Sequence, residues 1–143
     1  MTLIKRILLV DDDTVTNMLH QRVIAKSGLV EVIDVATDGQ EALDILNADL
    51  TAHRPLPELI FLDINMPGMG GFEFLEQYPK LNVEADAQLI IVMLSTSLLP
   101  ADHWRAEADP NVHSFCDKPL RLENLITLIE EFQPEDAEGR SVA

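Results

Sequence analysis

The sequence predicts an α/β fold in which helices cover both faces of a five-stranded parallel sheet. Five short apolar runs recur along the 143 residues, and they lack the polar alternation of strands that have one face in water. Helical patterns stand between these runs, so the chain is organised as five β-α units. Right-handed crossovers in such units place helices on both sides of the sheet.

The predicted strands are rich in β-branched and aliphatic residues, as buried parallel strands are. They cover residues 7–10, 30–35, 59–62, 89–94 and 112–116.

The first predicted helix lies between the first two strands. Val15, Met18, Leu19 and Val23 follow the spacing i, i+3, i+4, i+8 that is typical of a helix. Gly28 is placed to end this helix, because glycine readily adopts the left-handed conformation found there.

The second and third helices follow the second and third strands. Ala42, Ile45 and Leu46 repeat the helical spacing, and residues 47–57, with two prolines, are expected to form a loop. A shorter helix is predicted over residues 71–78.

The last two helices complete the pattern. The fourth is expected within residues 100–109, which contain Trp104. The fifth has apolar positions at Leu122, Leu125, Ile126 and Ile129. It cannot continue past Pro134, so we expect one domain over residues 1–133 and a flexible polar tail over residues 134–143.

The composition narrows the range of functions. A net charge of −15 repels phosphate backbones and anionic lipids, so we expect neither nucleic-acid binding nor membrane binding. A single cysteine excludes an intramolecular disulfide, and the apolar run near the N-terminus is too short for a secretion signal. These features favour a cytoplasmic protein.

Polar residues follow four of the predicted strands. Asp11 and Asp12 follow the first strand and Asp63 the third. Ser95 follows the fourth strand, and the fifth leads within two residues to Lys118. The carboxyl ends of parallel strands share one edge, where ligands of such folds bind, so a strand order of 2-1-3-4-5 would bring these side chains together.

Carboxylates gathered in this way favour a bound cation. Two of them about 5 Å apart repel by roughly 3 kcal/mol at an effective dielectric near 20. An all-oxygen environment favours Mg²⁺, which prefers few protein ligands together with phosphate oxygens. Asp11, Asp12, Asp63 and the main-chain carbonyl of Asn65 are the candidate ligands.

The same residues have the types that phosphoryl transfer requires. Asp63 is the candidate nucleophile, which would form an acyl phosphate. Ser95 would donate a hydrogen bond to a phosphoryl oxygen, and Lys118 would pair with another. Asp13 is interpreted as a cap of the first helix.

Four segments of the chain resemble the signature segments of response-regulator receiver domains. They are ILLVDDD, LIFLDINMPGMGG, IIVMLSTS and FCDKPL. The resemblance covers about residues 4–132 and is to single-domain, chemotaxis-regulator-like members without an output domain. It implies a flavodoxin-like (βα)5 fold with the strand order 2-1-3-4-5.

The resemblance assigns the site residues the roles given above and adds two expectations. Phe115 would be the aromatic residue that moves inward when Ser95 is drawn to the phosphoryl group. The Lys118–Pro119 bond is expected to be cis. The chain departs from the family pattern at Gly70-Gly71, where many members have Asp-Gly, and thereby loses a potential helix cap.

The resemblance also implies partners. The phosphoryl donor would be a histidine kinase or a histidine phosphotransfer protein, with Thr14, Thr16 and Leu19 as candidate docking residues. The downstream partner is a separate protein of unknown identity, and a homodimer is possible. Two alternatives remain: an interaction module of the same fold that is not phosphorylated, and an aspartate-nucleophile phosphohydrolase. Such hydrolases commonly carry an acid where this chain has Asn65.

Overall fold

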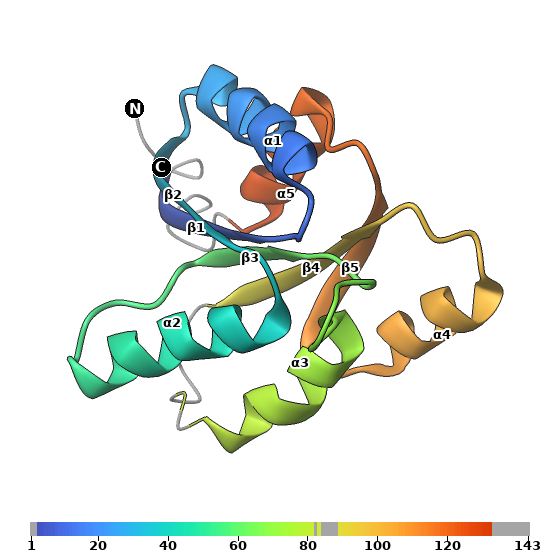
Figure 1. Cartoon of the computed structure of the whole chain (residues 1–143). Helices are drawn as coiled ribbons and strands as arrows, with labels where there is room; N and C mark the ends of the chain where they lie inside the picture. Colours follow the sequence, from blue (N-terminus) through green and yellow to red (C-terminus); the bar gives the residue numbers. More distant parts are fainter. Residues whose placement is uncertain (1–2, 82, 84–88, 133–143) are drawn as a thin grey trace.

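The computed structural model describes residues 3–81, 83 and 89–132 as five parallel strands with helices on both faces (Figure 1). The strands are β1 (Ile4–Val10), β2 (Val30–Ala36), β3 (Leu59–Leu62), β4 (Ile90–Ser95) and β5 (Val112–Asp117). Their order is β2-β1-β3-β4-β5, with every neighbouring pair parallel. The predicted fold class and strand order are therefore confirmed.

The helices form a layer on each side of this sheet. They are α1 (Thr14–Ser27), α2 (Gly39–Thr51), α3 (Gly71–Gln77), the short 3-10 helix η1 (Tyr78–Lys80), α4 (Pro100–Ala108) and α5 (Leu122–Glu131). Helices α1 and α5 pack together on one face, while α2, α3 and α4 cover the other (Figure 1). Among the described residues, no helix has the length and apolar character to span a membrane.

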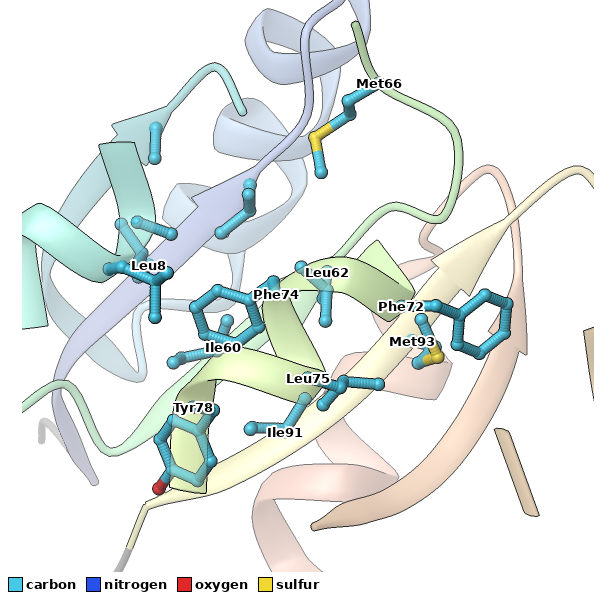
Figure 2. Close-up of a cluster of buried hydrophobic side chains, with 14 of the residues drawn as sticks. Leu8, Ile60, Leu62, Met66, Phe72, Phe74, Leu75, Tyr78, Ile91 and Met93 are labelled. Atoms are coloured by element: carbon cyan, nitrogen blue, oxygen red, sulfur yellow. The ribbon is translucent and has the colours of Figure 1, made fainter. Parts of the chain in front are cut away.

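Each face of the sheet has its own apolar core. Figure 2 shows the core beneath α2 and α3, where side chains of α3 and η1 lie over side chains of the central strands. Phe74 is fully buried there, and its ring stacks on that of Tyr78 with 5.9 Å between ring centroids. These contacts hold α3 against the strands that end at the site.

The predicted helix α1 is confirmed, and Gly28 ends it in the left-handed conformation with φ 69°. Most of the apolar residues that predicted this helix, however, do not lie on its buried face. Val15 and Leu19 are exposed, whereas Asn17, His20 and Ile24 are buried. The reason is that this face of α1 meets polar backbone near the sheet edge, so buried side chains that form hydrogen bonds are stable there.

The predicted loop over residues 47–57 begins too early, because α2 continues to Thr51. The extra turn carries the buried Asp49, whose carboxylate pairs with Arg6 of β1 at 2.8 Å and with Arg54 at 3.2 Å. These ion pairs link the end of α2 to the sheet, which local sequence patterns do not reveal.

Burial of the strands on both faces holds for the three central strands only. The edge strands β2 and β5 carry exposed residues such as Val32 and His113, because one side of each has no neighbouring strand. The third helix, predicted over residues 71–78, is confirmed as α3, and η1 follows it directly. The expected tail over residues 134–143 lies outside the described residues.

Candidate functional site

Three carboxylates meet where β1 and β3 end. Asp11, Asp12 and Asp63 each offer one oxygen, and these oxygens lie within 4.8 Å of one another. The strand pairing brings them together, because Val10 lies opposite Leu62 and the Asp63 N–H donates to the Val10 carbonyl at 2.9 Å. Asp11 and Asp63 are buried, whereas Asp12 is exposed.

Lys118 reaches this cluster from the other side. Its ammonium forms an ion pair with Asp11 and lies 3.1 Å from Oδ1 of Asp63. The backbone N–H of Lys118 donates to the Ser95 carbonyl at 2.9 Å, which ties the loop after β5 to the end of β4. The Lys118–Pro119 bond is cis, as predicted.

Ser95 is 1% exposed, and its Oγ accepts the N–H of Ser97 at 3.0 Å. Its hydroxyl hydrogen can still be donated to another group. Phe115 is half-buried, and its ring packs against that of His103 with 4.0 Å between centroids. Asn65 lies on the exposed loop after Asp63. The proposed metal contact of its carbonyl stays a prediction.

Burial and charge shift two pKa values at the site. Burial raises the pKa of Asp63, and the attraction of Lys118 only partly opposes this. For Lys118, burial acts to lower the pKa, but the hydrogen bond to Asp11 and the charges of Asp63 and Asp11 outweigh it. The Lys118 pKa is therefore raised, and this residue is an ammonium ion at neutral pH.

These donors fit a hard divalent cation. All three side chains offer carboxylate oxygens, the ligands that such cations prefer. Two of these residues, Asp11 and Asp63, are buried at the sheet edge. The exposed Asp12 leaves one side of the cluster open to solvent, where water or phosphate oxygens could complete the coordination. Asp11 and Asp63 share a single ammonium, so their negative charge exceeds the positive charge of Lys118.

Two local predictions concern helix caps near the site. Asp13 caps α1, as predicted, by accepting the N–H and the hydroxyl of Thr16. At Gly70, a Cβ atom would lie 2.7 Å from the Ile64 carbonyl oxygen, so this backbone has no room for the aspartate common in the family. The Glu73 carboxylate accepts the Gly70 N–H at 3.1 Å and caps α3 instead.

Two buried polar residues of α1 were not predicted as part of the site. Asn17 donates to the Asp11 carbonyl at 2.8 Å, and His20 Nε2 accepts the Leu120 N–H at 3.2 Å. Both line a small cavity together with Asp11 and Asp63. Asn17 and His20 are polar residues at a spacing of i, i+3, and this spacing alone does not distinguish a buried helical face from an exposed one.

A model of the response regulator receiver domain matches residues 7–130. The chain belongs to this family. Receiver domains are generally signalling domains rather than enzymes, and they act in two-component systems with histidine kinases or phosphotransfer proteins.

Curated relatives support the same assignment. The receiver chain is 34% identical over 127 residues to the "Probable methanogenesis regulatory protein FilR2" of Methanothrix harundinacea, covering 89% of the chain and 80% of that protein. It spans only 56% of the response regulator MprA of Mycolicibacterium vanbaalenii.

Solved structures agree with the fold. A two-component response regulator from Cytophaga hutchinsonii is 35% identical, with a TM-score of 0.82 over 90% of this chain and 96% of that one. The Mn(2+)-bound form of response regulator Rcp1 is 27% identical, with a TM-score of 0.64 over 90% of this chain and 91% of that one.

Proposed function

We propose that this receiver domain, over residues 1–133, takes a phosphoryl group from a phosphohistidine donor onto Asp63 in a Mg²⁺-dependent reaction. The observation that carries the proposal is the buried Asp63 carboxylate, which has an oxygen within 4.8 Å of oxygens of Asp11 and Asp12 and lies 3.1 Å from the ammonium of Lys118. The Asp63 carboxylate is thus a nucleophile with the permanent positive charge of Lys118 beside it.

The residues of the chain have distinct tasks in this transfer. An oxygen of Asp63 attacks phosphorus as the bond to the donor imidazole nitrogen breaks, and the imidazole keeps that electron pair and takes a proton from water. Lys118 is positioned to pair with an oxygen of the added phosphoryl group. No base is needed, because the carboxylate is already ionised, and slow loss of the phosphoryl group to water would reset the domain.

Asp11, Asp12, Asp63 and the Asn65 carbonyl would hold the Mg²⁺. When bound, the cation neutralises charge on the carboxylates and on the phosphoryl oxygens. The Mn(2+)-bound form of the related Rcp1 supports a divalent cation in this family member as well.

Phosphorylation would switch the domain through Ser95 and Phe115. A phosphoryl group adds about −1.5 to −2 charges and several acceptor oxygens. The Ser95 hydroxyl would turn to donate to one of them, and Phe115 would follow by leaving its contact with His103. Phe115→Ala should therefore abolish the phosphorylation-dependent change in the surface around α4, and an unaltered change would refute this route.

The cytoplasmic donor would dock beside the site. Val15, Met18 and Leu19 expose apolar surface on α1, next to Thr14 and Thr16. We propose this surface as the contact for a histidine kinase or phosphotransfer protein. The downstream protein, or a second copy of the chain, would read the surface of α4, β5 and α5, where Trp104 is 70% exposed.

Acetyl phosphate provides a direct test of the function. The full chain is incubated with it, with Mg²⁺ or with EDTA, and intact mass is recorded for the wild type, Asp63→Asn and the exposed control Asp44→Asn. We expect one added phosphoryl group in the wild type and the control, only with Mg²⁺, and none in Asp63→Asn. An unlabelled wild type would favour the non-phosphorylated module, whereas rapid turnover without an adduct would favour the phosphohydrolase.

A further inference from the structure

The loop that carries Lys118 is held by two backbone N–H groups, that of Lys118 itself and that of Leu120. The Lys118 N–H donates to the Ser95 carbonyl at 2.9 Å, and the Leu120 N–H donates to His20 Nε2 at 3.2 Å. Pro119, between them, has no N–H. The first bond ends on a backbone carbonyl that any residue supplies, but the second depends on one side chain of α1.

The bond to His20 lies in the interior. His20 is 3% exposed and Leu120 is 2% exposed, so water has little access to either group. A buried backbone N–H needs a partner. His20 therefore provides the acceptor that allows the chain after Pro119 to enter the core between α1 and α5.

The imidazole is in the state that this bond requires. Burial, and next the charge of Lys118, lower the pKa of His20, although Asp11 opposes this. The ring is consequently neutral at pH 7, and acceptance at Nε2 assigns its proton to Nδ1. His20 also lines the small cavity beside Asp11 and Asp63, so a displaced ring would disturb the loop close to the site.

We infer that His20 is a positioning residue for Lys118, which it holds in place for phosphoryl transfer to Asp63 by anchoring the Leu120 N–H. This inference rests on the proposed function. It differs from a purely structural role because it predicts loss of rate without loss of metal binding. The three carboxylates lie at the ends of β1 and β3, and the hydrogen bond of His20 goes to neither strand.

Three variants separate position from stability. His20→Leu removes the acceptor but leaves a side chain of similar size in the buried position. His20→Gln keeps an acceptor at about the reach of Nε2. Ile24→Ala is the matched control. Ile24 is fully buried one turn further along the same face of α1, but its side chain has no hydrogen-bond acceptor for the Leu120 N–H.

The readouts are the rate of Asp63 phosphorylation by acetyl phosphate at saturating Mg²⁺, the Mg²⁺ affinity, and amide hydrogen exchange at Leu120. In His20→Leu we expect a rate about tenfold or more below wild type, because small displacements of reacting groups are costly. Its Mg²⁺ affinity should not fall below that of wild type, because the three carboxylates stay in place, and its Leu120 amide should lose protection. His20→Gln and Ile24→Ala should keep both the rate and the protection.

The inference is overturned if the wild type is phosphorylated and His20→Leu is phosphorylated equally fast. It is overturned as well if Ile24→Ala slows phosphorylation as much as His20→Leu does. It is also overturned if the Leu120 amide of His20→Leu stays protected. A wild-type chain that takes up no phosphoryl group would instead refute the proposed function, and with it any role of His20 in that reaction.

Discussion

The ammonium of Lys118 occupies the space between two carboxylates that are also candidate metal ligands. It pairs with Asp11 and lies 3.1 Å from Asp63. An ammonium and a divalent cation compete electrostatically for the same oxygens. Lys118 therefore favours the transfer step by attracting the phosphoryl group, but it opposes binding of the metal that the step needs.

Lys118→Ala should separate these two effects. We expect Mg²⁺ to bind about tenfold more tightly, which corresponds to roughly 1.4 kcal/mol of relieved repulsion, while phosphorylation becomes slower. Isothermal titration calorimetry measures the affinity, with the exposed Lys80→Ala as control. Equal or weaker Mg²⁺ binding by Lys118→Ala would contradict the competition.

The raised pKa of Asp63 makes a prediction about stability and pH. The folded state holds the carboxyl proton more tightly than the unfolded state, so the charged form opposes folding above the folded pKa. In EDTA at pH 7, the midpoint of thermal unfolding of Asp63→Asn should therefore lie a few degrees above that of wild type. In a domain of this size, such a shift corresponds to about 1 kcal/mol in the free energy of unfolding. The difference should shrink as the pH falls through the raised pKa.

Thermal unfolding followed by circular dichroism between pH 7 and pH 4 measures this difference. Asp44→Asn, at an exposed position of α2, is the control. A destabilised Asp63→Asn at pH 7 would mean that the pair with Lys118 outweighs the burial of the carboxylate.

At the scale of elements, the sequence predicted most of what positions the site. Strand ends are predictable because a run of apolar residues that stops at Asp11, Asp63 or Ser95 marks the boundary itself. The inward face of α1 was not predictable from its apolar residues, because His20 is buried through a partner 100 residues away. Long-range hydrogen bonds of this kind leave no local pattern.

The candidate site was likewise predictable only in part. The placement of the three carboxylates and Lys118 at one edge follows from strand order alone, and the structure confirms it. The roles of these residues in chemistry stay predictions. The capping of α3 by Glu73 could not be foreseen, because it depends on how closely Gly70 approaches the Ile64 carbonyl.

Gly71, the first residue of α3, lies against the nucleophile loop. A Cβ atom there would be 2.3 Å from the Asp63 carbonyl oxygen, and no side-chain rotation can relieve a contact with backbone. We expect Gly71→Ala to lower the free energy of unfolding by about 3 kcal/mol and to slow phosphorylation, because α3 or the Asp63 peptide must move.

Chemical denaturation and the acetyl phosphate assay measure the two effects. Gly28→Ala is the control: its φ is +69° but no atom lies within 4 Å of the added Cβ. It should cost about 1–2 kcal/mol of stability and leave the rate unchanged. A Gly71→Ala variant with normal stability and rate would show that the loop tolerates displacement.

At the scale of the whole molecule, the net charge of −15 opposes the compact state. Salt should therefore stabilise the fold. Raising NaCl from roughly 10 to 150 mM, which shortens the Debye length to about 8 Å, should raise the unfolding midpoint in EDTA. A falling midpoint would instead indicate that ion pairs such as Arg6–Asp49 outweigh the repulsion.

The proposed function requires that one carboxylate at the sheet edge forms the acyl phosphate, and locating that bond tests this requirement. After reaction with acetyl phosphate and Mg²⁺, borohydride reduces an aspartyl phosphate to homoserine, and peptide mass spectrometry then identifies the changed residue. We expect homoserine at position 63 alone. Homoserine at position 11 or 12, or a phosphate ester on Ser95, would contradict it.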